Sequence, residues 1–373
     1  MTDFPFDRLR RWPDIEAANL CASDATDRLV LAAADSEIAA SLPGDVVVIG
    51  DRYGALTLGA AWVGAAGIRV HQDGLSGERA LANNAATLSA ADRFANVPLE
   101  ASAVDGARIV LLQLPRSLDA LAEIAELVAR HAAADVTVFA GGRVKHMTYA
   151  MNDVLGEYFG SVTASLAQQK SRVLLAREPH PPAGDPVWPA REFHGDLGLW
   201  VYAHGAAFAG TKVDIGTRFL LGFLDGLPAA ETAIDLGCGT GILATALARA
   251  RPAMSVTATD QSASAVASAR QTASANGVAD RVRVVRDDGL SGWTDASAEL
   301  ILLNPPFHVG ATVHAGIAGK LFDEAARVLR PGGELWTVWN SHLGYRAALE
   351  RTVGPTRQLG RNSKFTVTVS VKR

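Results

Sequence analysis

The chain has 373 residues, of which 49% are hydrophobic and 20% are charged, so it can bury a large core, and its length favours two domains. The net charge of −4 disfavours a general nucleic-acid coat protein, because neutralising phosphates takes clustered Lys and Arg. No run approaches the roughly 20 apolar residues of a membrane span, residues 1–12 lack the apolar stretch expected of a signal peptide, and two cysteines are too few for a disulfide framework. We therefore expect a cytoplasmic protein without a metal.

The first half of the chain repeats the plan of the second half in weaker form. The strand-like run 45–50 matches the run that ends at 237, and the run 109–115 matches the run 300–306. Gly50 lies 63 residues before Gln113, and Gly237 lies 67 residues before Asn304. We interpret the halves as two copies of one fold, although any two α/β domains would share much of this pattern. The first copy lacks the glycine series and the asparagine of the second, so we predict that it is catalytically silent.

A proline-rich stretch separates the two halves. Five prolines fall between residues 178 and 189, and proline disfavours both helix and central strand. We therefore place a first domain at 1–178, a linker at 179–190 and a second domain at 191–373. Residues 1–190 carry 16 basic and 23 acidic side chains, whereas 191–373 carry 19 and 16, so the second domain is the better candidate for binding a polyanion.

Short β-branched runs alternate with Ala-rich segments of helical length in the second domain, as expected of βαβ units around a parallel sheet. The expected strands are 233–236, 255–259, 282–286, 300–303 and 334–339. The expected helices lie near 240–251, 262–276 and 315–329. Residues 356–359 and 365–371 are expected to close the sheet as an antiparallel pair.

A glycine-rich turn follows the strand at 233–236. Residues 235–241 read Asp-Leu-Gly-Cys-Gly-Thr-Gly, and glycines at such a turn let the backbone approach a ligand closely. Ile242 stands where the dinucleotide fingerprint needs its third glycine, which disfavours NAD. Cys238 has no nearby His, so we interpret it as a small loop residue.

Acidic residues follow the next two strands. Asp260 comes 25 residues after Asp235, where a carboxylate can accept both hydroxyls of a ribose. Asp287 and Asp288 end the following strand, where one of them can accept the amino hydrogens of an adenine, and the sequence does not choose between them. Any single acid here is as readily a helix N-cap, but the ordered set favours a nucleoside cofactor.

The run Asn304-Pro305-Pro306-Phe307 ends the fourth strand, at the edge of the sheet that carries the glycine turn. An exocyclic aromatic amine is a poor nucleophile because its lone pair is delocalised into the ring. The side-chain oxygen of Asn304 and the carbonyl of Pro305 are two acceptors for its hydrogens, and Phe307 offers a face for stacking an extruded base. For His308 we favour local hydrogen bonding over catalysis.

This ordered set resembles the class I S-adenosylmethionine-dependent methyltransferases, and the tetrapeptide resembles those that act on planar amines. The resemblance implies S-adenosylmethionine as cofactor and no metal, because a sulfonium methyl is already activated. By resemblance, the cofactor-binding residues are Asp214, Asp235, Gly237, Gly239, Gly241, Asp260, Asp287 and Asp288. The catalytic residues are Asn304, Pro305, Pro306 and Phe307.

Residues 205–221 contain Phe208 and then Asp214-x-Gly before an apolar run, which is similar to the segment preceding the first strand in bacterial ribosomal RNA guanine-N2 methyltransferases. The final Asn-Ser-Lys-Phe at 362–365 is also similar to that family. The resemblance implies two tandem Rossmann-like α/β domains. The N-terminal one is degenerate, and the C-terminal one has a mostly parallel seven-stranded sheet closed by an antiparallel strand.

The resemblance also implies the reaction, which is methyl transfer to the exocyclic N2 of a guanine in ribosomal RNA. The segment 142–148 favours the large subunit over the small one. Ribosomal RNA or a ribosomal subunit is then the partner, and we expect a monomer. The rival interpretations are an adenine-N6 or protein glutamine-N5 methyltransferase with the same tetrapeptide, and a non-catalytic RNA-binding or ribosome assembly factor.

Overall fold

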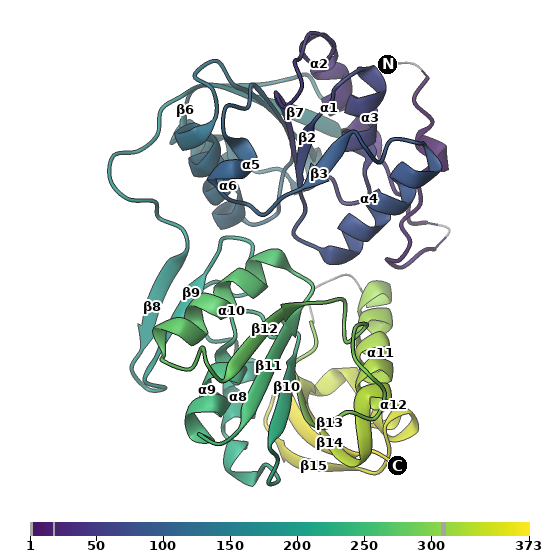
Figure 1. Cartoon of the computed structure of the whole chain (residues 1–373), viewed down its shortest axis with the longest axis vertical. Helices are drawn as coiled ribbons and strands as arrows, with labels where there is room; N and C mark the ends of the chain where they lie inside the picture. Colours follow the sequence, from purple (N-terminus) through teal and green to yellow (C-terminus); the bar gives the residue numbers. More distant parts are fainter. Residues whose placement is uncertain (1–2, 18, 307–310) are drawn as a thin grey trace. The chain divides into compact units, whose positions relative to one another are not determined.

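The computed structural model describes residues 3–17, 19–306 and 311–373. The chain divides into two compact units, Met1–Trp188 and Pro189–Arg373, each built around its own seven-stranded sheet (Figure 1). Within the described residues, no helix combines the length and apolarity needed to cross a membrane.

The two sheets share one topology. The first runs β3-β2-β1-β4-β5-β7-β6, and the second runs β12-β11-β10-β13-β14-β16-β15. In each sheet the first five strands are parallel, and the last two pair antiparallel. The strand-by-strand match confirms the predicted tandem Rossmann-like fold and shows that the weak sequence repeat is a structural repeat.

The strands of the first unit are β1 (Val46–Ile49), β2 (Ile68–His71), β3 (Phe94–Asn96), β4 (Ile109–Gln113), β5 (Thr137–Arg143), β6 (Phe159–Ala164) and β7 (Ser171–Pro179). Its helices are α1 (Ala25–Ala33), α2 (Asp35–Ala39), α3 (Ala55–Val63), α4 (Leu75–Thr87), α5 (Ala101–Val104), α6 (Leu118–His131) and α7 (Tyr149–Gly156). One face of the sheet packs against α1 to α4 and the other against α5 to α7.

The strands of the second unit are β8 (Ala190–His194), β9 (Leu199–Ala203), β10 (Thr232–Leu236), β11 (Ser255–Asp260), β12 (Val282–Arg286), β13 (Ala298–Leu303), β14 (Leu329–Asn340), β15 (Thr356–Arg361) and β16 (Phe365–Val371). Its helices are α8 (Ile215–Leu221), α9 (Ile242–Ala250), α10 (Ala263–Ala275), α11 (Ala311–Val328) and α12 (Arg346–Thr352). Helices α8, α9 and α10 cover one face of the sheet, and α11 and α12 cover the other (Figure 1).

Alternating side chains of the central strands fill both cores, which explains the continuous apolar runs in the sequence. In β13, Leu300 and Leu302 face α8 to α10, whereas Ile301 and Leu303 face α11 and α12. A strand buried on both faces has no polar face, as is usual for parallel sheets. The ends of such strands are therefore the places where polar residues meet solvent and ligands.

Strand β14 starts earlier than its apolar run predicts. It begins at Leu329, which pairs with Ala298, and the register then shifts so that Leu300 pairs with Glu334. Residues 330–333, including Pro331, take up this irregularity, since proline is tolerated in a strand only at a bulge or an edge. The strand expected at 334–339 therefore corresponds only to the regular part of β14.

The hairpin β8–β9 was not predicted from the sequence. Its second strand lies on α10, and side chains in or directly after this helix accept backbone N–H groups in or directly after β9: Trp200 to Asn276 (3.0 Å), Tyr202 to Thr272 (3.0 Å) and His204 to Ser268 (2.9 Å). Leu199 and Val201 pack against Ile242, the first residue of α9. The hairpin thus supports the helix that follows the glycine turn.

Candidate active site

Four neighbouring strands bring the predicted residues to one edge of the second sheet. In the central strand β10, Leu236 pairs with Thr259 of β11 on one side and with Leu303 of β13 on the other. The residues that follow these three are Gly237, Asp260 and Asn304, so they are neighbours at the carboxyl edge. The backbone N–H of Asp287 donates to the carbonyl of Asp260 at 3.0 Å, which adds the end of β12 to the row. Ligands of open α/β sheets bind at this edge.

The three positions of the turn are occupied by glycine for different structural reasons. Gly237, Gly239 and Gly241 all have positive φ angles, of 72°, 52° and 76°, which disfavour other residues. A Cβ at Gly241 would lie 2.8 Å from Cβ of Ala269, so this glycine lets α9 and α10 approach. A Cβ at Gly237 or Gly239 would meet nothing within 4 Å. These two glycines keep open the space above the turn, where a ligand can approach the backbone.

Asp260 orients the turn. One of its carboxylate oxygens accepts the N–H of Gly239 at 3.0 Å, and the other accepts the N–H of Ser262 at 3.0 Å, before helix α10. The carboxylate therefore ties the ends of β10 and β11 together, and it is placed where the sequence predicts a ribose. Cys238 is buried, and burial raises the pKa of its thiol well above the usual value, so it is not a nucleophile.

Asp235 lies beneath the turn. Its side chain is 1% exposed, and one oxygen accepts the N–H of Ala244 in the first turn of α9 at 3.0 Å. The other oxygen is buried and finds no hydrogen-bond partner in the described part of the chain. Burial, reinforced by the charge of Asp260, raises the pKa of Asp235 to about 7. The carboxyl group thus leaves a buried acceptor under the glycine turn.

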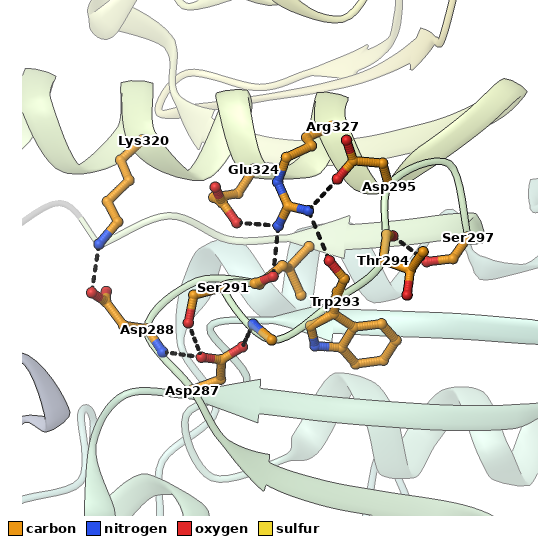
Figure 2. Close-up of polar contacts among 12 residues, drawn as sticks. Asp287, Asp288, Ser291, Trp293, Thr294, Asp295, Ser297, Lys320, Glu324 and Arg327 are labelled. Atoms are coloured by element: carbon orange, nitrogen blue, oxygen red, sulfur yellow. Dashed lines mark hydrogen bonds and ion pairs between the residues drawn. The ribbon is translucent and has the colours of Figure 1, made fainter.

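The two acids that follow β12 have different surroundings (Figure 2). Asp287 turns into its own loop, where it accepts the hydroxyl of Ser291 at 2.5 Å and the N–H of Gly292 at 3.1 Å. Asp288 forms an ion pair with Lys320 of α11 at 2.6 Å. Asp287 therefore shapes the loop, while Asp288 links the loop to α11, and both carboxyl groups stay at the end of β12.

The loop after β12 is fixed a second time against α11 (Figure 2). Arg327 donates to the backbone carbonyls of Leu290 at 2.7 Å and Trp293 at 2.8 Å, and it pairs with Asp295 and Glu324. These contacts and the Lys320 ion pair hold the wall of the site on the adenine side predicted from the sequence.

Asn304 has a fixed orientation. Its Nδ2 group donates to a carboxylate oxygen of Asp214 at 3.0 Å and to the hydroxyl of Thr217 at 3.0 Å. A carboxylate only accepts hydrogen bonds, so the amide nitrogen must face Asp214. The amide oxygen is buried and without a hydrogen-bond partner among residues 3–17, 19–306 and 311–373. Asn304 thus presents one unused acceptor at the carboxyl edge.

Asp214 is the N-cap of α8. The same carboxylate oxygen that meets Asn304 accepts the N–H groups of Gly216 at 2.9 Å and Thr217 at 3.1 Å. A Cβ on Gly216 would lie 3.3 Å from the Asn304 amide oxygen, so the glycine lets the helix approach the amide closely. The Asp-x-Gly pattern therefore builds a helix start that clamps Asn304, and the proposed contact of Asp214 with the cofactor stays a prediction.

Other members of the predicted catalytic set are placed only in part. Pro305 is buried and Pro306 is exposed, immediately after Asn304. Phe307 and His308 lie outside the described residues. Thr217 and Lys320 were missed by the sequence reasoning, although Thr217 stands three residues after a helix N-cap, where a side chain points back toward the cap.

The site fits S-adenosylmethionine. A nucleoside with an amino acid tail needs an open backbone cradle and acceptors for hydroxyl and amino groups. Gly237 and Gly239 provide the cradle, and the carboxylates of Asp260 and of the pair at 287–288 lie in order beside it.

Comparisons with known proteins agree with this geometry. The family model "RLMG N-terminal domain" matches residues 2–180, and the model "Methyltransferase small domain" matches residues 198–369. The solved structure of the T. thermophilus 16S rRNA N2 G1207 methyltransferase, in complex with AdoMet and guanosine, has a TM-score of 0.72 and 21% identity. That similarity covers 91% of this chain and 92% of the other, and it shows a common two-unit fold.

Curated relatives match along almost the whole chain. The ribosomal RNA large subunit methyltransferase G of Streptomyces avermitilis is 34% identical over an alignment of 392 positions. The alignment covers 98% of this chain and 97% of the relative. The protein of the same name from Pseudomonas aeruginosa PAO1 is 36% identical over 365 residues, covering 96% of each. The resemblance to ribosomal RNA methyltransferases is thereby confirmed, and the protein belongs to the ribosomal RNA large subunit methyltransferase G family.

Proposed function

We propose that this protein transfers a methyl group from S-adenosylmethionine to the exocyclic N2 amine of a guanine in large-subunit ribosomal RNA. The observation that carries the proposal is the buried, unused amide oxygen of Asn304, whose orientation Asp214 and Thr217 fix. The orientation of this acceptor is fixed before the substrate amine arrives. The names of the relatives supply the large subunit as the source of the RNA.

The chain's own residues act on the amine. The oxygen of Asn304 and the carbonyl of Pro305 accept the two N–H groups, which draws the nitrogen toward sp³ geometry and frees its lone pair for attack. S-adenosylmethionine supplies an activated methyl group on a sulfonium. The nitrogen–carbon bond forms as the carbon–sulfur bond breaks, and the amine then releases one proton to solvent. The contribution of the protein is mainly orientation, since amide and carbonyl oxygens are too weakly basic to take that proton.

The cofactor is proposed to lie along the row of strand ends. Gly237 and Gly239 would face its methionine part, Asp260 its ribose hydroxyls, and the acids at 287–288 its adenine. This order would bring the amino acid end and the sulfonium next to Asn304, because β10 and β13 are adjacent. The sulfonium methyl and the amine held by Asn304 would then be neighbours at the carboxyl edge of the sheet.

The proposal is tested with methyl-labelled S-adenosylmethionine, unmodified large- and small-subunit RNA, and separated subunits, followed by digestion to nucleosides. We expect label in N2-methylguanosine of the large-subunit RNA with the wild-type chain, and incorporation about 100- to 1,000-fold slower with Asn304→Ala. A control titration should show that Asn304→Ala still binds the cofactor.

The other outcomes separate the rival functions. Label in N6-methyladenosine would keep the amine chemistry and refute guanine. Label in the glutamine of a protein would refute RNA as the substrate. If the wild-type chain does not bind the cofactor and does not methylate RNA, the result would support a non-catalytic RNA-binding or ribosome assembly factor.

A further inference from the structure

The two acids at the end of β12 differ in what their carboxylates do. The carboxylate of Asp287 accepts three hydrogen bonds from its own loop: from the N–H of Asp288 at 2.8 Å, the hydroxyl of Ser291 at 2.5 Å and the N–H of Gly292 at 3.1 Å. Asp287 is 6% exposed, and two of these donors are backbone groups, so turning its carboxylate toward a ligand would break the loop. Asp287 therefore serves the loop itself.

Asp288 is held from outside the loop (Figure 2). Its Oδ2 atom pairs with the Nζ atom of Lys320, 32 residues later in α11, at 2.6 Å. The side chain of Asp288 is 12% exposed and that of Lys320 is 47% exposed, so the carboxylate is partly buried while the lysine stays in contact with water. One ammonium N–H uses one of about four lone-pair sites on a carboxylate, so the ion pair leaves Asp288 able to accept a further donor.

Lys320 also offsets negative charge at this edge of the sheet. Asp260 and Asp287 end adjacent strands, where the N–H of Asp287 donates to the carbonyl of Asp260 at 3.0 Å, and Asp288 adds a third carboxylate. Carboxylates on neighbouring strand ends repel one another, and an uncharged purine cannot compensate them. A compensating cation has to come from the protein, and Lys320 supplies one to Asp288.

The loop after β12 is anchored to α11 independently of Lys320. Lys320, Glu324 and Arg327 lie on one face of α11, since they are spaced by four and then three residues. A Cβ on Gly289 would lie 3.4 Å from the Cγ of Glu324, so the loop packs directly on this face. Arg327 donates to two backbone carbonyls of the loop, at 2.7 and 2.8 Å. Lys320 is therefore left with the narrower task of holding the side chain of Asp288.

We propose that Lys320 is a positioning residue for the cofactor: its ion pair holds the carboxylate of Asp288 to accept the exocyclic amine of adenine. Asp288, and not Asp287, is then the acid that contacts adenine. The identity of the ligand rests on the proposed function, whereas the fixed direction of Asp288 rests on the ion pair alone. A carboxylate held in one orientation accepts the amine at a small cost in side-chain entropy, and it repels a purine that carries a carbonyl at the same position.

The test measures, by calorimetry on the full-length chain, the dissociation constants of S-adenosylhomocysteine and of S-inosylhomocysteine, in which a carbonyl replaces the purine amine. We expect the wild type to bind the adenosyl ligand at least about tenfold more tightly, because only that ligand offers a donor to the carboxylate. Lys320→Met should weaken the adenosyl ligand about five- to twentyfold and the inosyl ligand less than about twofold. Lys320→Arg keeps the cation and should restore most of the preference.

Three further variants separate positioning from support of the loop. Asp288→Ala should lose the same preference, and adding Lys320→Met to it should cause no further loss, because the two residues act as one pair. Asp287→Asn should lower the melting temperature of the chain and keep the preference for the adenosyl ligand. Arg330→Met is the matched control and should change neither dissociation constant, because Arg330 forms a similar ion pair with Glu299, at 2.9 Å, at the amino ends of β14 and β13.

Several outcomes would overturn the proposal. If Lys320→Met weakens both ligands equally, the lysine only supports the loop, and if Asp287→Asn abolishes the preference, Asp287 is the acid that contacts adenine. A wild-type chain that binds neither ligand, or does not distinguish them, refutes the adenine site itself. In methyl-transfer assays the defect of Lys320→Met should appear in the KM for S-adenosylmethionine and not in kcat. If the wild-type chain methylates no RNA, the proposed function fails, and the two dissociation constants still decide on Lys320.

Discussion

Replacing Thr217 with valine tests whether the fixed amide of Asn304 matters for catalysis. The change keeps the side-chain shape but removes the hydroxyl that accepts one Nδ2–H of Asn304 at 3.0 Å. The other Nδ2–H remains bonded to Asp214 at 3.0 Å, so one of the two hydrogen bonds that orient the amide is kept. Leaving one buried N–H unpaired costs about 1 to 2 kcal/mol.

If that cost falls on the transition state, kcat decreases about five- to thirtyfold, because 1.4 kcal/mol corresponds to a factor of ten. Asn304→Ala removes the acceptor itself and should decrease kcat about 100- to 1,000-fold, as the loss of a preorganised polar group does elsewhere. Thr217→Ser restores the hydroxyl and should restore most of the rate.

The assay is steady-state methyl transfer at saturating RNA, with cofactor affinity measured by calorimetry and stability by thermal unfolding. The reasoning requires that Thr217→Val lowers kcat while the affinity for S-adenosylmethionine and the melting temperature change little. A valine variant with wild-type kcat, or one whose defect lies wholly in cofactor binding, would refute the role assigned to the Asn304 amide.

Three other predictions follow from the same unit. Gly237→Ala should weaken cofactor binding at least tenfold, because its Cβ would enter the open space proposed for the cofactor, and the positive φ should cost about 1 kcal/mol of stability. Gly241→Ala adds a clash with Ala269 to the same backbone strain, so it should lower the melting temperature further, by several degrees. Because its pKa is raised, protonated Asp235 contributes about 4 kcal/mol to the free energy of unfolding below about pH 4, and this contribution is lost as the pH rises through about 7. Asp235→Asn should therefore weaken the pH dependence of the unfolding free energy, measured with denaturant, between pH 5 and 8. Asn304→Asp places a second carboxylate against Asp214, so its unfolding free energy should fall more steeply than that of the wild type from pH 5 to 8.

Much of the second unit could be predicted because local sequence determines it. Apolar β-branched runs mark strands buried on both faces, and each chemically distinctive residue follows directly at a strand end. The predicted seven strands, their mixed edge and the order of the glycine turn, acids and Asn304 are local signals of this kind. The parallel register then places their ends together.

The parts that could not be predicted depend on tertiary contacts. Asp214 and Asn304 are 90 residues apart, and nothing near either residue indicates that one orients the other. The different surroundings of Asp287 and Asp288 depend on Lys320 from α11. The hairpin β8–β9 was missed because α10 pairs with its backbone, and the side chains that do so give no strand signal.

The hairpin β8–β9 also determines where this protein can be cut. A fragment that starts at residue 198, where the methyltransferase family model begins, would lose β8 and leave β9 as an unpaired edge. It would also loosen the cover that Leu199 and Val201 give to Ile242 at the start of α9. A separate second unit should therefore begin at Pro189, because the recognisable domain in the sequence is shorter than the segment that keeps β9 paired with β8.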